Sequence, residues 1–170
     1  NDAATLQPMD EQPLRGTLTK SDWEYTLKQP IDGAKPVKLK LAGSEGTGYI
    51  KGVDATTKLS AENYGNYGVV YRVNFTVASE RPLSFILNPI GGYFAGYGVL
   101  EHEGQRQLIA LPEYDLCLGE TVEEAVELAK LKAGKYSFVW SPPGASNLPI
   151  ELIWRSSKSR LNKAYARSDA

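Results

Sequence analysis

The residues that could carry catalysis are few. The only histidine, His102, stands between Glu101 and Glu103 and before Gly104, where the pattern predicts the end of a hairpin. A serine–histidine–carboxylate triad would need this histidine, but the G-x-S-x-G turn that commonly presents the serine is absent from the sequence. We therefore expect His102 to be an exposed turn residue.

Carboxylates are the other candidates for acid–base chemistry, as in glycoside hydrolysis, where two acids flank the scissile bond. Acidic side chains in the second half of the chain qualify by residue type alone: Glu101, Glu103, Asp115, Glu120 and Glu124. The sequence does not pair them, so a solvated face is the simpler interpretation and a hydrolase remains an alternative. We expect no enzymatic activity.

Metal and cofactor sites have no signature here. With one histidine and one cysteine, Cys117, the chain cannot form a site from paired imidazole or thiolate ligands. We expect Cys117 to be a small buried residue between two leucines. A surface Ca²⁺ held by loop oxygens would leave no pattern to find. No cofactor is expected.

Aromatic side chains offer a different chemistry, because sugars stack on them. The chain has ten tyrosines and three tryptophans. The best placed are Tyr64 and Tyr67, with Asn66 available to hydrogen-bond hydroxyl groups, on a connection rich in glycine and asparagine that spans Asp54 to Gly68. Long connections of this kind are often functional. The sequence therefore predicts a carbohydrate-binding surface at Tyr64, Asn66 and Tyr67.

A second cluster of glycine and aromatic residues lies at positions 91–98. Glycine weakens strands and marks bulges or close backbone approach. Strand curvature is one interpretation of this cluster. A docking surface that includes Tyr93 and Tyr97 is the other.

Alternation with a period of two indicates the elements that must position these residues. Between residues 69 and 77, apolar side chains alternate with polar ones: Val69, Tyr71, Val73, Phe75 and Val77. About ten segments of this kind, separated by turn signals, predict an all-β fold. We predict an antiparallel β-sandwich, Ig-like or jelly-roll-like, with aromatic residues filling the space between two sheets.

One segment departs from this pattern. Thr121 and Glu124 form a capping-box pattern, and the apolar residues that follow share a helical face before Gly134. We predict a short helix near 121–133. The alternative is that its second half, Glu127 to Lys132, forms a strand.

The chain divides into an extended leader over 1–14, a sandwich domain over 15–155 and a basic tail over 156–170. A chain of 170 residues is long enough to bury one core without metal or disulfide. The leader contains only acidic charged residues: Asp2, Asp10 and Glu11. Cations dominate the other end of the chain: Arg155, Lys158, Arg160, Lys163 and Arg167.

Charge and hydropathy argue against nucleic-acid binding and against a transmembrane segment. The formal net charge of −1 argues against nucleic acid, which is bound by clustered lysine and arginine. No stretch approaches the roughly 20 apolar residues of a transmembrane segment, and no signal region opens the sequence. The start at Asn1 fits a processed secretory protein and equally fits a piece trimmed from a longer chain. We expect an extracellular or cell-surface location.

Two turn motifs carry a resemblance to a known group of proteins. They are N-P-I-G-G over 88–92 and S-P-P-G-A-S-N-L-P over 141–149. The region from Tyr64 to Trp154 resembles secreted bacterial β-sandwich domains that accompany copper-amine-oxidase-like stalk domains in cell-surface proteins. The resemblance implies a surface or secreted setting and a non-enzymatic role. No catalytic or copper-binding residue carries over.

These observations favour a β-sandwich that acts through association, as a self-assembling fibre or surface-layer subunit. The acidic leader could contact the basic tail of the next subunit, or add a strand to an open sheet edge. The alternative function is a carbohydrate-binding module. Self-association and a glycan are the expected partners, without nucleic acid.

Overall fold

The computed structural model describes residues 18–20, 22–43, 48–111, 118–119, 125–143 and 146–157. Within these residues every regular element is a β-strand. The strands are β1 (Asp22–Thr26), β2 (Val37–Leu41), β3 (Ile50–Val53), β4 (Ser60–Asn63), β5 (Val70–Val77), β6 (Leu83–Asn88), β7 (Gly96–His102), β8 (Gln105–Leu111), β9 (Val126–Leu131), β10 (Gly134–Trp140) and β11 (Ile150–Ser156). The expected leader and Cys117 lie outside the described residues, as does the tail beyond residue 157.

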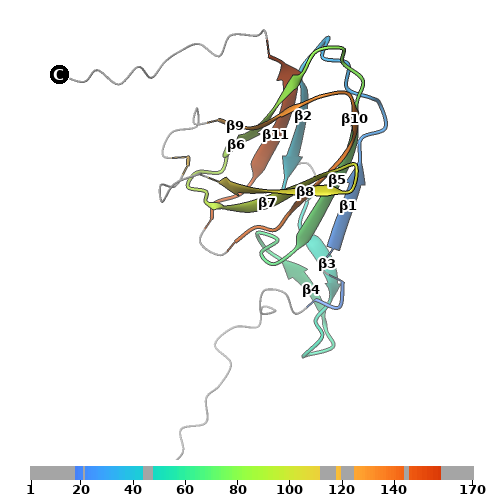
Figure 1. The fold of residues 1–170 in the computed structure, drawn as a ribbon. Coiled ribbons are helices and arrows are strands. Elements are labelled where there is room, and N and C mark those ends of the chain that lie inside the picture. Colours follow the sequence, from blue (N-terminus) through green and yellow to red (C-terminus); the bar gives the residue numbers. More distant parts are fainter. Residues whose placement is uncertain are drawn as a thin grey trace, which may run out of the picture.

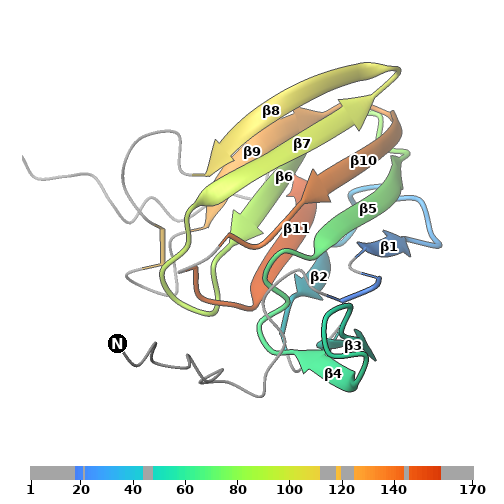
Figure 2. The same ribbon diagram turned by 90° about the horizontal axis from the view of Figure 1, so that it is seen from below.

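Two sheets pack face to face, which confirms the predicted all-β sandwich (Figure 1). One sheet has five strands in the order β1-β5-β10-β7-β8, and the other has four in the order β2-β11-β6-β9. Strands β3 and β4 form a separate hairpin at one end of the sandwich, as Figure 2 shows from a second direction. The described part contains no helix that is long and apolar enough to cross a membrane.

One strand pair differs from the predicted antiparallel arrangement. Strand β1 runs parallel to β5, with Trp23 opposite Tyr71 and Tyr25 opposite Val73. Parallel neighbours need a long connection between them. Strands β2, β3 and β4 supply that connection. All the other described strand pairs are antiparallel.

Aromatic rings from both sheets fill the core, as the alternation in β5 predicts. The ring of Phe75 lies 5.7 Å from that of Phe85 and 5.0 Å from that of Trp154, both in the four-stranded sheet. Edge-to-face and offset contacts at such distances add to the gain from burying the rings. These three side chains are at most 3% exposed. The apolar face of β5 therefore joins the two sheets.

The predicted helix near 121–133 is wrong over its described part, where the alternative strand is found as β9. The register between β6 and β9 shifts at a β-bulge in β9, so that Ala129 faces Phe85, Glu127 faces Ile86 and Leu128 has no residue opposite it. A bulge adds one residue to a strand. The extra residue, Leu128, breaks the period of two and leaves apolar residues at spacings that imitate a helix. Residues 121–124 lie outside the described part.

Candidate functional site

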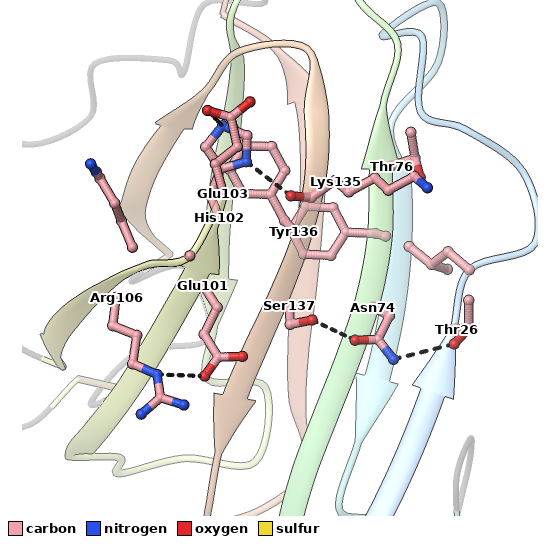
Figure 3. Close-up of a pocket in the computed structure, with 14 residues that line it drawn as sticks. Thr26, Asn74, Thr76, Glu101, His102, Glu103, Arg106, Lys135, Tyr136 and Ser137 are labelled. Carbon is pink, nitrogen blue, oxygen red and sulfur yellow. Dashed lines mark hydrogen bonds and ion pairs between the residues drawn. The ribbon is translucent and has the colours of Figure 1, made fainter.

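A depression of about 890 Å³ lies on the outer face of the five-stranded sheet, near the end of the β7–β8 hairpin. Its walls come from all five strands of the sheet and the hairpin turn, and most of the lining side chains are polar (Figure 3). The outer face exists because alternate residues of each strand point away from the core. In β5, Arg72, Asn74 and Thr76 are half-buried, while their neighbours are buried.

The strand register assembles the outer face into rows that cross the sheet. One row is wholly polar and follows the pairings of β1, β5, β10, β7 and β8: Thr26, Asn74, Ser137, Glu101 and Arg106. Figure 3 shows these side chains next to one another across the sheet. Residues opposite each other on paired strands are close enough to interact directly. Distant parts of the sequence therefore form one polar surface.

Asn74 is the centre of a hydrogen-bond network in this row. Its amide Nδ2 donates to Glu24 Oε1 at 2.8 Å and to Thr26 Oγ1 at 3.4 Å. The Ser137 hydroxyl donates to Asn74 Oδ1 at 2.5 Å. Each contact fixes one side-chain orientation, so the polar groups are ordered before any ligand arrives.

Glu101 is held between two arginines. Arg72 Nη1 donates to Glu101 Oε2 at 2.6 Å, and Arg106 Nε lies 3.1 Å from Glu101 Oε1. The hydrogen bond from Arg72, together with the charges of Arg72 and Arg106, holds the pKa of Glu101 below its ordinary value. Glu101 is therefore ionised at neutral pH and is a poor proton donor.

The rows next to the polar row are more apolar. Val139, Val99 and Leu108 face one another across β10, β7 and β8, and Tyr97 pairs with Ala110 one row further on. Tyr97 and Leu108 are 66% and 68% exposed. A ligand that lies along the strands could thus contact an exposed phenol ring at one end and hydrogen-bonding groups at the other.

His102 is better packed than an exposed turn residue, so that expectation is corrected. Its ring stacks on Tyr136 with centroids 4.1 Å apart, and its Nδ1 lies 2.9 Å from the carbonyl oxygen of Lys135. Gly134 makes this packing feasible, because a Cβ at that position would overlap the imidazole ring. Burial raises the pKa of Tyr136, whose hydroxyl donates to the carbonyl oxygen of Lys132. His102 therefore supports the wall of the depression.

Asn66, predicted to contact sugar, is buried and supports the protein itself. Its Nδ2 donates to Gly48 O at 2.8 Å and to the Tyr71 hydroxyl at 2.6 Å, while Oδ1 accepts from the amide of Ile50. Its φ of 50° lies in the left-handed region, which asparagine tolerates better than most residues. Asn66 anchors the connection to the hairpin and does not reach the surface.

The other predicted binding residues separate into two locations. The Tyr67 hydroxyl donates to Ser146 O, and Asn147 N donates to Tyr93 O, so segment 146–147 joins Tyr67 to Tyr93 at one end of the sandwich. Tyr64 is 56% exposed and packs edge-on against Tyr49. Tyr97 lies on the outer face of β7, two rows from the polar row. None of the five predicted binding residues lines the depression, whereas His102, Glu101 and Glu103, considered above for catalysis, do line it.

Gly98 lets the ring of Phe138 pack directly against the backbone of β7. A Cβ there would overlap the ring of Phe138 on the neighbouring strand β10. This accounts for one member of the glycine cluster by close approach of the backbone to a core ring. Tyr97, the residue before it, points the opposite way.

The described groups offer no activated nucleophile. Ser137, the serine of the polar row, donates to an amide oxygen rather than to a base. His102 contacts Glu103 only at 3.8 Å and is turned toward a backbone carbonyl. In the part of the chain that the structure covers, no group of three or more His, Cys, Asp and Glu side chains could hold a metal ion. Asp115, Glu120 and Glu124 lie outside it.

Sequence reasoning missed Asn74 and Ser137 as site residues. Each alternates with buried apolar residues along its own strand, and the pairing that joins the two residues is long-range. No protein-family model matches this chain, and no curated protein matches its sequence. The case for function therefore depends on the geometry of the outer face.

Proposed function

We propose that this chain is a non-enzymatic β-sandwich domain that acts through association, and that the outer face of its five-stranded sheet binds a neutral oligosaccharide. The observation that carries the proposal is the ordered polar row centred on Asn74, on the same face of the sheet as the exposed ring of Tyr97 two rows away. Sugars need donors and acceptors for their hydroxyl groups and an apolar surface for their C–H faces. The outer face supplies both.

Charge balance favours a neutral ligand over an anionic one. In the depression, Glu101 and Glu103 offset Arg106 and Lys135. Glu101 and its arginines are already paired, so a charged ligand would have to compete with ordered ion pairs. A hydroxyl group can instead share the remaining donors and acceptors of the row.

The polarity of the lining also favours a glycan over a protein partner. The centre of a protein–protein interface is depleted of charged residues. Charged and hydroxyl-bearing side chains line the depression, and the aliphatic residues Val99 and Leu108 lie in the neighbouring row. An extracellular or cell-surface location belongs to the same proposal, because extended glycans are displayed there.

A glycan array probed with the full chain tests this function. We expect binding to neutral oligosaccharides, and we expect Asn74→Ala to lower the affinity for the best ligand by about tenfold or more, the effect of losing roughly 1.4 kcal/mol. Lys35→Ala, at an exposed lysine in the β1–β2 connection, is the control. An array without a neutral ligand, or an unchanged affinity in a folded Asn74→Ala protein, would exclude the proposal. Capture of a protein partner through the same face would replace the glycan as its occupant.

A further inference from the structure

A second recess lies where the edges of the two sheets meet, between β8 and β9. It has a volume of about 270 Å³, and its floor is apolar, formed by Leu100, Leu131 and Tyr136 together with Ala129. Polar and basic side chains form the rim: His102, Gln105, Arg106, Gln107, Lys130 and Lys132. We call this recess the edge groove.

The edge groove is basic. Its lining includes three cations and no carboxylate. Arg106 already pairs with Glu101, but Lys130 and Lys132 are exposed and form no ion pair within the described residues. An apolar floor under unpaired ammonium groups suits an acidic peptide with some apolar side chains.

The strands that border the groove are both sheet edges. Among the described strands, β8 pairs only with β7, and β9 pairs only with β6. An edge strand presents unpaired backbone N–H and C=O groups, and an extended peptide can bind there by adding a strand. Strand β8 has seven residues, long enough for such pairing.

The chain itself contains a segment with the required chemistry. Residues 1–14 include Asp2, Asp10 and Glu11, no lysine or arginine, and the apolar side chains Leu6 and Met9. Opposite charges on the segment and on the groove would favour their encounter and fix their register.

The position of the groove favours a segment from another molecule. The described chain begins at Leu18, which bridges to Asp54 beside the β3–β4 hairpin. Figures 1 and 2 both place that hairpin away from β8 and β9. A leader from a neighbouring molecule can reach the groove without passing around its own sandwich.

We propose that residues 1–14 of a second copy bind in the edge groove and add a strand to β8, so that copies of this chain associate head to tail. This contact is heterologous, and a heterologous contact that does not close into a ring produces a filament. The depression and the groove share His102, Gln105, Arg106 and Tyr136, but Lys130 and Lys132 line the groove alone and Asn74 lines the depression alone, so the two proposals are tested at different side chains.

A charge-swap experiment with the full chain tests the proposal. One variant reverses the groove, Lys130→Glu/Lys132→Glu, and a second reverses the leader, Asp10→Lys/Glu11→Lys. By light scattering coupled to size-exclusion chromatography at low salt, we expect wild type to associate and each variant alone to be monomeric. Mixing the two variants should restore association, because the basic leader of one then fits the acidic groove of the other.

Three results would overturn the proposal. They are a wild-type chain that is monomeric at all concentrations, a groove variant that associates like wild type, and a mixture that stays monomeric. Lys28→Glu/Lys35→Glu, which reverses two exposed lysines in the β1–β2 connection, is the matched control and should associate like wild type.

Discussion

The two faces of the five-stranded sheet are made by the same strands but place different demands on the sequence. On the inner face, Tyr71, Val73 and Phe75 of β5 are buried against the other sheet. On the outer face, Asn74 and Arg72 belong to two separate polar networks, one joining β1, β5 and β10 and the other joining β5, β7 and β8. The inner face needs only apolar residues of suitable size at alternate positions. The outer face needs particular side chains to meet across the register.

This difference explains why the inner face can be predicted from the sequence and the outer face cannot. Core packing is non-directional, so alternation alone identifies the residues that take part. A hydrogen-bond network is directional, and its members are known only when strand order and register are known. The following substitutions test the distinction, from the largest expected effect on stability to the smallest.

Truncation on the inner face should cost most. Phe75→Ala removes a ring that contacts Phe85, Tyr136 and Trp154, and we expect it to lower the free energy of unfolding by about 3–5 kcal/mol. Thr76→Ala, the next residue on the outer face, should change it by less than about 0.5 kcal/mol. Urea denaturation measures both. Similar losses for the two variants would contradict the assignment of faces.

A polar group that supports the inner face should come next. Asn66→Ala leaves the Gly48 carbonyl and the Ile50 amide without their partner and places alanine at a left-handed φ. We expect a loss of about 2–4 kcal/mol in the same denaturation assay. Asn66→Gly relieves the backbone strain but not the lost hydrogen bonds, so it should be milder than alanine and still destabilising. A neutral Asn66→Ala change would leave Asn66 free for a binding role.

The ion pairs of the outer face should give a smaller effect that depends on pH. Because the folded pKa of Glu101 is lowered, its contribution is present above the unfolded pKa, about 4.3, and is lost as pH falls through the folded value. The difference in unfolding free energy between wild type and Glu101→Gln should therefore be largest near neutral pH and shrink in acid. A difference that grows as pH falls below 4 would contradict the proposed pairing.

The sequence was sufficient for the architecture but not for the site. Alternation identified β5, β10 and the all-β class, because burial of one face leaves a clear period of two. It failed at β9, where the bulge at Leu128 shifts that period. It also placed sugar binding at Asn66, since an asparagine on a glycine-rich connection looks exposed until its hydrogen bonds to Gly48 and Tyr71 are seen.

The outer-face claim is tested most directly by two tyrosines of similar exposure. Tyr97 is 66% exposed on the same face as the polar row, and Tyr64 is 56% exposed on the connection that the sequence favoured. Both can be changed to alanine with little effect on stability, so loss of binding would report on contact with the ligand. A glycan array should be probed in parallel with wild type, Tyr97→Ala and Tyr64→Ala. We predict that Tyr97→Ala loses binding and Tyr64→Ala keeps it; the reverse result would contradict the assignment of the site to the outer face.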